Sequence, residues 1–243
     1  MIILANIIAT WPAPDNIHAL TTRRYPGHSL PPYDSNNLGL HVGDNPDHVL
    51  KNRADLISFL NLPSEPVWLE QTHSNRCVLV EEDPNRQADA AVTRSPDRVL
   101  AIMTADCLPV MLCNRQGTEI AAVHAGWRGL VNGVIDNTIV KMKSDPEELL
   151  AWIGPAICPS CYEVGEDVRW TFLNRYKFAA DAFQPHQQKW LADLPGLARL
   201  VLENAGVSAV YLSNLCTYEQ KKDFYSYRRE QQTGRMVTLV WFN

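Results

Sequence analysis

Short apolar runs alternate with polar turn residues along much of the chain, and this pattern predicts β-strands. The apolar N-terminal stretch, residues 1–14, is expected to form a first strand, because it lacks the basic start and the small-residue cleavage site of a signal peptide. The other predicted strands are bounded by turn residues and cover Pro66–Glu70, Cys77–Val80, Val99–Thr104, Pro109–Cys113, Glu119–His124 and Met236–Phe242.

Apolar residues recur at helical spacing in other segments. The predicted helices are Pro46–Leu60, with Asp44 and Asn45 as candidate caps, and Leu130–Lys143, Glu166–Asn174 and Leu194–Asn204. Strands and helices are mixed without a regular βαβ alternation. The pattern therefore predicts an α+β fold, a layered sandwich with mixed, largely antiparallel sheets.

Composition narrows the class of protein. The 243 residues are 46% apolar and contain no linker-like stretch, so one domain over residues 1–243 is expected. The net charge of −5 comes with scattered basic residues, which argues against a nucleic-acid binder. No apolar run approaches the roughly 20 residues of a membrane span, and the six cysteines are too sparse for a disulfide framework. A cytoplasmic protein with a small-molecule partner is expected, whereas the oligomeric state is not predicted.

A thiol and an imidazole flank one predicted hairpin. If its strands pair around a centred turn, Cys113 faces Thr118 and Cys107 faces His124. Directly opposed residues have Cβ atoms about 4.5–5.5 Å apart, which suits two ligands of one metal ion. A bulged turn ending at Gly117 would shift this register by one residue.

A third candidate ligand, His73, follows the predicted strand that ends at Glu70. Zinc and copper both bind imidazole and thiolate, and three protein ligands with an open fourth position are typical of a catalytic site. The alternatives are a buried thiol with locally hydrogen-bonded histidines, or a closed site in a non-enzymatic module with Cys113 as fourth ligand.

The remaining motifs give weaker signals. Cys158 and Cys161 have the spacing of a zinc knuckle or a redox pair, but no second pair accompanies them. The glutamate that zinc nucleobase deaminases place two residues after a histidine is absent after His124. Surface or capping roles are expected for the other histidines, His18, His28, His41, His48 and His186.

Several long motifs resemble the YfiH-like laccase-domain family, once described as multicopper polyphenol oxidoreductases and now regarded as purine nucleoside phosphorylases. The motifs follow one another over nearly the whole chain, as LPPYDSNNLGLHVGD, WLEQTH, MTADCLPVMLC, AAVHAGWRG, GPAI, YEVG and YSYRR. The chain departs from the family pattern at residues 24–27 (RYPG) and at Ser74, both in loops expected to lie near a pocket.

The resemblance implies a layered α/β sandwich with a zinc ion bound by His73, Cys107 and His124. It also implies phosphate-dependent cleavage of adenosine, inosine, guanosine and methylthioadenosine, with adenosine deamination as a further activity. Copper is the alternative metal. A role in editing peptidoglycan precursors is attached to some bacterial relatives.

The reaction needs residues that bind the phosphate anion and move a proton, and the sequence offers candidates for both tasks. Arginine suits phosphate because its guanidinium donates paired hydrogen bonds. Arg53 is the first candidate, and its alternative role is that of a solvated residue on a helix. Arg128 is the second candidate, and its alternative role is to stack against Trp127. A metal-bound water and the Asp106 carboxylate would serve deamination, unless Asp106 is a turn or hydrogen-bonding residue. Asn37 would bind nucleoside or hold its loop.

A copper-dependent polyphenol oxidase is the main rival enzyme. It would use the same types of ligand, but a multicopper oxygen-reducing centre requires additional pairs of histidines. The chain has seven histidines and no His-x-His pair. The sequence therefore favours the nucleoside enzyme.

Overall fold

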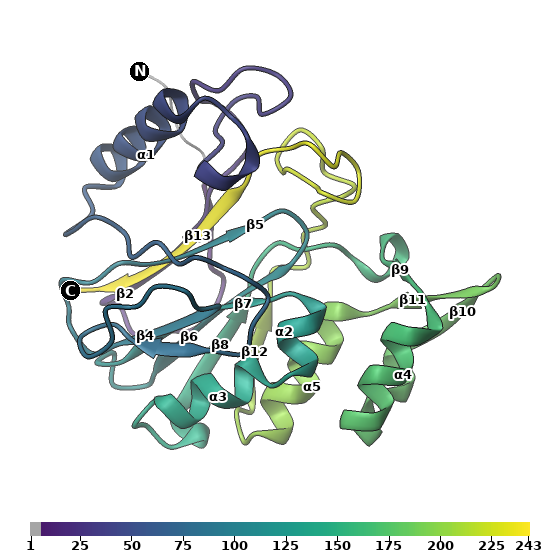
Figure 1. Cartoon of the computed structure of the whole chain (residues 1–243). Helices are drawn as coiled ribbons and strands as arrows, with labels where there is room; N and C mark the ends of the chain where they lie inside the picture. The colour runs from purple at the N-terminus through teal and green to yellow at the C-terminus, as the bar shows by residue number, and fades with distance from the viewer. Residues whose placement is uncertain (1–5) are drawn as a thin grey trace.

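The computed structural model describes residues 6–243, which form stacked β-sheets with helices on the outer sides (Figure 1). The six-stranded sheet has the order β12 (Ala209–Leu212), β8 (Leu149–Ile153), β6 (Leu108–Asn114), β7 (Ile120–Ala125), β4 (Ala90–Thr93) and β3 (Cys77–Leu79). The four-stranded sheet has the order β1 (Ile7–Ile8), β2 (Ile17–Thr21), β13 (Met236–Phe242) and β5 (Leu100–Thr104). A small sheet adds β10 (Phe183–His186), β11 (Lys189–Ala192) and β9 (Glu163–Val164).

Most strand pairs are antiparallel, and the exceptions are β12 with β8 and β3 with β4. The predicted α+β sandwich with mixed, largely antiparallel sheets is confirmed. Within residues 6–243, no helix is both long and apolar enough to cross a bilayer.

The helices lie on opposite sides of the stacked sheets (Figure 1). Beside the four-stranded sheet lies α1 (Pro46–Leu60), and beside the six-stranded sheet lie α2 (Trp127–Val131), α3 (Val134–Lys141) and α5 (Leu194–Asn204). The remaining helix, α4 (Glu166–Arg175), lies beside α2 and the small sheet. Single 3-10 turns cover Leu40–Val42 (η1), Pro146–Glu148 (η2) and Pro159–Cys161 (η3), and a longer one covers Lys177–Ala182 (η4).

Helix boundaries follow the predicted signals with one exception. The predicted bounds of α1 and α5 are confirmed, and the Asn45 side chain caps α1 by accepting a hydrogen bond from the Asp47 N–H at 2.9 Å. The single helix predicted over 130–143 is wrong. It divides into α2 and α3 because Gly133 takes a left-handed backbone with φ of 88°, which interrupts the helix.

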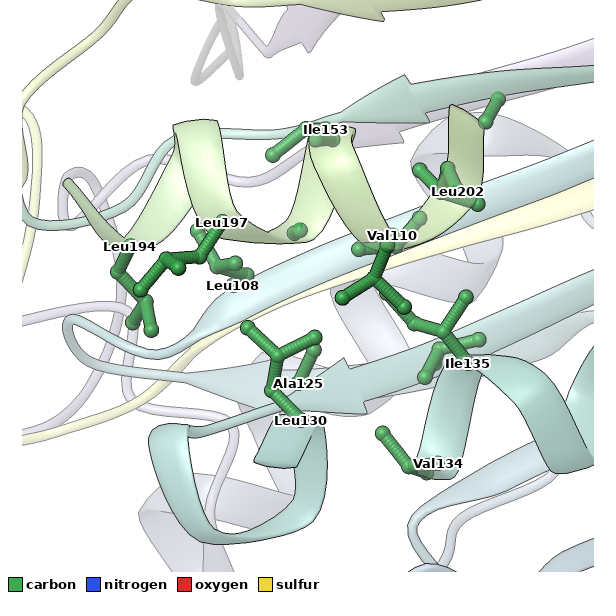
Figure 2. Packing of buried hydrophobic residues seen from close by; sticks show 14 of the residues in the cluster. Leu108, Val110, Ala125, Leu130, Val134, Ile135, Ile153, Leu194, Leu197 and Leu202 are labelled. Carbon is green, nitrogen blue, oxygen red and sulfur yellow. The ribbon is translucent and has the colours of Figure 1, made fainter. Parts of the chain in front are cut away.

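Both faces of the six-stranded sheet are buried, which explains why its strands are continuously apolar. Along β6, Leu108, Val110 and Leu112 pack toward α2, α3 and α5, whereas Met111 and Cys113 pack toward the four-stranded sheet. Figure 2 shows the helix side of this core, where Leu130, Val134, Leu197 and Leu202 meet the strands. A further apolar layer separates the four-stranded sheet from α1.

Two predicted strands need correction. Residues 66–70 make only an isolated bridge between Val67 and Leu100, because the next residues bond elsewhere: Glu70 N–H donates to Arg86 O at 2.8 Å. The first strand is reduced to β1, and the predicted part of it at residues 1–5 lies outside the described residues.

The predicted hairpin register is also wrong. Cys113 pairs with Ile120 and Pro109 with His124, a shift of two residues from the centred turn. The Asn114 side-chain oxygen accepts the N–H groups of Thr118 and Glu119, at 2.8 and 3.1 Å, and so lengthens the turn. Because a shift of two keeps each side chain on its face, Cys107 stays on the side of His124.

Candidate metal centre and its cavity

The topology gathers many loops at one edge of the sheets. β5 ends there, β6 begins there and β7 ends there, so Cys107 and His124 lie at neighbouring strand ends. β13 starts opposite the end of β5, with Met236 paired to Thr104, which brings Arg235 to the same place. The segment that contains His73 runs into β3 at this edge, beside the start of β4.

The three predicted ligands meet at this edge. One ligand atom each from His73, Cys107 and His124 lies within 4.8 Å of the other two, and Cys107 Sγ is 3.7 Å from His73 Nε2. The two imidazole rings meet edge to face with centroids 4.8 Å apart. His73 is exposed, Cys107 is partly buried and His124 is buried. The fold thus brings together residues that are 34 (His73 and Cys107) and 17 (Cys107 and His124) positions apart in the chain.

A buried carboxylate, Asp89, organises two of these ligands. Its side chain accepts hydrogen bonds from His124 Nδ1 at 2.7 Å and from the backbone N–H groups of Thr72, His73 and Ser74 at 3.2, 3.0 and 2.6 Å. These bonds hold His73 at φ of 60°, a left-handed conformation that is costly for a non-glycine residue. Because Nδ1 is committed to Asp89, Nε2 is the nitrogen of His124 that can bind a metal ion once its proton leaves, an arrangement common around metal-bound histidines.

The charges of the ligands depend on one another. Burial raises the pKa of Cys107, but hydrogen bonds and positive charge from His124 and His73 outweigh it and lower the pKa to about 6. Burial lowers the pKa of His124, yet Asp89 and Cys107 outweigh it and raise the pKa to about 9. Metal-free protein at neutral pH therefore carries a thiolate beside an imidazolium, and a metal ion must displace the imidazolium proton.

Gly126 keeps space open for the ligands. It follows β7 and is the N-cap residue of α2, with φ of −64°. A Cβ atom at this position would lie 2.6 Å from His73 Cδ2 and 3.0 Å from Cys107 Sγ. Glycine is required here by the approach of the two side chains, since the backbone conformation itself is one that any residue adopts.

A cavity of about 520 Å³ opens beside the three residues. This volume lies in the range of small-molecule sites. Aromatic rings, cationic groups and polar side chains line it together with the ligands, from His41, Gln71, Met103, Thr104, Ala105, Asp106, Trp127, Arg128, Ile157, Tyr162, Tyr227, Arg228 and Arg235. The combination of apolar rings and a few convergent charges suits a ligand that is part aromatic and part anionic.

The two candidate phosphate residues have different surroundings. Arg53 is not among the residues that line the cavity: its guanidinium donates twice to Leu38 O, at 3.0 and 2.8 Å, and lies 3.6 Å from the centroid of the Trp68 ring. Burial lowers its pKa to about 10. Arg128 lines the cavity, with its guanidinium 4.4 Å from the Trp127 ring centroid.

Asp106 and Asn37 make many hydrogen bonds to the protein. The Asp106 carboxylate accepts from Thr217 Oγ1 at 2.7 Å, from Ser226 Oγ at 3.0 Å and from the Arg228 N–H at 2.7 Å. The Asn37 side chain is fully buried, outside the cavity lining, and its oxygen accepts from the Arg235 N–H at 2.9 Å. Asp106, itself part of the cavity lining, and Asn37, behind it, therefore both hold cavity-lining segments in place.

Sequence reasoning missed several residues at the site, among them Asp89, Gln71 and His41. Asp89 stands before β4 in an apolar stretch, where a fully buried carboxylate is itself a signal of a polar partner. The Gln71 side-chain amide hydrogen-bonds to the Met103 backbone as a neighbouring strand would: it donates to the C=O and accepts from the N–H, both at 2.8 Å. His41, expected at the surface or at a cap, lines the cavity, and burial with nearby Arg235 and Arg53 lowers its pKa.

The donor set fits a bound metal ion. Two imidazoles and one thiolate are borderline-soft ligands of the kind that zinc and copper favour. Cys113, the fourth ligand that a closed site would need, is not part of the group and is buried between the sheets. A mixed α/β sandwich with a His₂Cys group beside a cavity is thus the class of protein that the fold and site define.

Comparison with known proteins places the chain more closely. Residues 17–243 match the family described as multi-copper polyphenol oxidoreductase laccase, and the chain belongs to this family. It is 49% identical to Purine nucleoside phosphorylase YfiH of Escherichia coli (strain K12), over 97% of this chain and 98% of that protein. It is 46% identical to a purine nucleoside phosphorylase of Haemophilus influenzae, over 96% and 97% of the two chains.

Solved structures agree with this placement. The crystal structure of Neisseria meningitidis protein NMB0706 superposes with a TM-score of 0.94 at 46% identity and covers 98% of this chain and 99% of that one. YlmD from Geobacillus stearothermophilus superposes with a TM-score of 0.86 at 28% identity, with complete coverage of both chains. The resemblance predicted from the sequence motifs is confirmed.

Proposed function

We propose that this protein is a zinc-dependent purine nucleoside phosphorylase that also deaminates adenosine. The observation that carries the proposal is the meeting of His73, Cys107 and His124 beside a cavity that Arg128 and aromatic rings also line. The names of the relatives from Escherichia coli and Haemophilus influenzae support it. The substrates proposed are adenosine, inosine, guanosine and methylthioadenosine.

In this proposal His73, Cys107 and His124 hold the metal ion. Zinc suits two histidines and a cysteine with an open position, and copper is the alternative that the same donors accept. When bound, zinc would supply Lewis-acid polarisation and acidify a water molecule. Asp89 fixes the tautomer of His124, because Nδ1 is committed to the carboxylate.

Arg128 is proposed to bind phosphate in place of Arg53. Within residues 6–243 its guanidinium lies beside the Trp127 ring and makes no hydrogen bond or ion pair, so its donors can turn to an anion. Arg53 directs its donors to Leu38 O. A planar guanidinium can give phosphate two parallel hydrogen bonds.

The purine is proposed to lie among Tyr162, Tyr227 and Trp127, whose rings line the cavity. Aromatic faces bind flat bases by stacking. Arg228 lies 5.1 Å from the Tyr162 ring centroid and donates to Glu163 O at 2.9 Å, which steadies that ring. A nucleoside so placed has its ribose between the base and the proposed phosphate position.

His41 is proposed to carry the proton that deamination moves. Its lowered pKa keeps the imidazole neutral at pH 7, and a neutral imidazole can accept a proton. Asp106, the first candidate for this task, is proposed instead as a positioning residue, because three hydrogen bonds tie its carboxylate to Thr217, Ser226 and Arg228. His41→Gln should lower ammonia release more than base release.

The decisive experiment supplies zinc-loaded protein of known metal content with adenosine or inosine, with and without phosphate. Free base and ribose 1-phosphate are expected only with phosphate, and ammonia is expected from adenosine under both conditions. Full zinc occupancy with neither product would overturn the proposal. Oxygen uptake with a phenol after copper loading would favour the polyphenol oxidase, and turnover of a peptidoglycan precursor in place of nucleosides would favour the editing role.

A further inference from the structure

A second group of metal-type side chains lies outside the cavity lining. It consists of Cys158, Cys161, Cys216 and Glu219, and one ligand atom from each lies within 4.8 Å of the other three. All of these cysteines are free thiols. The sequence motif at 158–161 lacked a second cysteine pair, but the fold supplies one cysteine and one carboxylate from a segment almost 60 residues further along the chain.

The spacing of this group suits a tetrahedral ion. Zinc–sulfur bonds of about 2.3 Å place tetrahedral ligand atoms about 3.8 Å apart. Cys161 Sγ lies 3.7 Å from Glu219 Oε1, and the Cys158 N–H donates to Cys216 Sγ at 3.4 Å. The cysteine sulfurs therefore need only small side-chain rotations to surround one ion.

The backbone brings the two segments together independently of any ion. Ala156 and Cys216 form a parallel bridge, in which the Ala156 N–H donates to Leu215 O at 3.2 Å and the Thr217 N–H donates to Ala156 O at 3.0 Å. Cys158 is the N-cap residue of the turn η3 and Cys161 is its last residue, and the turn brings both side chains close to Cys216. A site that is largely formed by the backbone loses little entropy when it binds an ion.

We propose that Cys158, Cys161, Cys216 and Glu219 form a second, structural zinc site. Three thiolates and a carboxylate fill all four tetrahedral positions, which is the mark of a structural rather than a catalytic site. Thiolate-rich donor sets favour zinc over magnesium or calcium. This site is separate from the catalytic group and does not depend on the proposed nucleoside chemistry.

The site would clamp two walls of the cavity. Ile157 and Tyr162, next to the cysteines of the first segment, line the cavity. In the second segment, Thr217 follows Cys216 and donates to Asp106, which in turn holds the Arg228 N–H. An ion at the four ligands thus fixes the loops that carry the proposed purine-binding rings.

Metal counting tests the proposal directly. Protein purified without chelators, analysed by inductively coupled plasma mass spectrometry, should contain two zinc ions per chain in the wild type and in Cys77→Ser, a control thiol outside both groups. Cys161→Ser and Cys107→Ser should each retain one. Glu219→Gln should weaken the second ion at least tenfold in a chelator competition. Amide hydrogen exchange in residues 156–162 and 216–229 should quicken at least tenfold in Cys161→Ser, and not in Cys107→Ser.

Cobalt substitution identifies which ligands hold each ion. The thiolate-to-cobalt absorption should fall to about three quarters in Cys107→Ser, because three of the four ligating thiolates remain. In Cys161→Ser it should fall to about one quarter, because the whole second site is lost. If Cys161→Ser fails to fold, Glu219→Gln and the wild-type spectrum decide the question.

Two results would overturn the proposal. One is a Cys161→Ser protein that keeps the metal content and cobalt absorption of the wild type. The other is a wild-type protein in which mass spectrometry finds Cys158 joined to Cys161 or Cys216 by a disulfide. A wild type with one ion that Cys107→Ser retains would support the second site and contradict the catalytic one, so the two proposals fail separately.

Discussion

At the residue scale, the site depends on one buried carboxylate. Asp89 has no exposed surface and accepts from His124 Nδ1, from three consecutive backbone N–H groups and from Ser74 Oγ at 2.7 Å. It therefore orients one ligand through its ring and another, His73, through its backbone. Although burial works against ionisation, hydrogen bonds from His124 and Ser74 keep the pKa of Asp89 below its usual value.

Asp89→Asn should weaken metal binding by about 10- to 100-fold, the usual effect of losing a partner of a metal-bound histidine. The amide offers an N–H₂ group where the site needs an acceptor. Chelator competition measures the effect, with circular dichroism to verify folding. Ser74→Ala, which removes one hydrogen bond to the carboxylate, should have a metal affinity between those of the wild type and Asp89→Asn. The control Asp181→Asn, at an exposed position, should match the wild type. An unchanged affinity in Asp89→Asn would contradict this role.

Arg128→Ala should raise the KM for phosphate at least tenfold, which corresponds to about 1.4 kcal/mol of lost binding. Among residues 6–243, the guanidinium of Arg128 makes no hydrogen bond or ion pair, and it lies at the cavity beside the Trp127 ring. Steady-state phosphorolysis of inosine at varied phosphate measures the change, with the surface variant Arg199→Ala as control. Adenosine deamination should change less, because it uses no phosphate. An equal loss of both activities would place Arg128 in another role.

At the element scale, the turn from β7 into α2 sets the shape of the site. His124 is the second-last residue of β7. Gly126, the N-cap residue of α2, follows only two residues later. The helix packs so closely that a Cβ atom on Gly129 would lie 2.9 Å from Ser74 O, in the segment that also carries His73. The strand, the helix start and the His73 loop are therefore placed together.

Gly126→Ala should displace His73 and Cys107 and abolish tight metal binding while the protein remains folded. The added methyl group meets two ligand side chains at 2.6 and 3.0 Å. Gly165→Ala is a matched control, since Gly165 is also a helix N-cap residue but its Cβ would come closer than 3.0 Å only to the Asp167 carboxylate, which can rotate away. Calorimetric zinc titration of both variants checks this. Wild-type affinity in Gly126→Ala would show that the ligands have more room than their positions indicate.

Gly133→Ala should destabilise the protein by about 1–2 kcal/mol, the cost of a left-handed backbone for a residue with a Cβ atom. Gly133 has φ of 88° and separates α2 from α3. Urea denaturation measures the loss. Gly133→Asn should lose less, because asparagine tolerates this conformation better. If alanine were neutral, the break between the helices would need another explanation.

The sequence predicts elements well where the pattern is local. The bounds of α1 and α5 follow from their caps and periodicity. The three candidate ligands are predicted from the apolar runs that precede them, although the run before His73 forms only an isolated bridge. The hairpin register could not be predicted, since it depends on how the Asn114 side chain bonds within the turn. The place of Arg53 also depends on distant partners, Leu38 and Trp68.

At the scale of the whole molecule, the site forms because strands of both large sheets have ends at the same edge. The ligands come from the approach to β3, the start of β6 and the end of β7, and Arg235 stands at the start of β13. The second cysteine group joins the same edge, because β8 and β12 are parallel and lead into it. Residues from across the chain thus meet only in the folded protein.

The central claim is that His73, Cys107 and His124 hold the ion that nucleoside cleavage requires. The most direct measurement is ribose 1-phosphate formed from inosine and phosphate by zinc-loaded wild type and by Cys107→Ser, compared at equal folded concentration. The account predicts product from the wild type and at least a hundredfold less from the variant. Equal product from both proteins would contradict it.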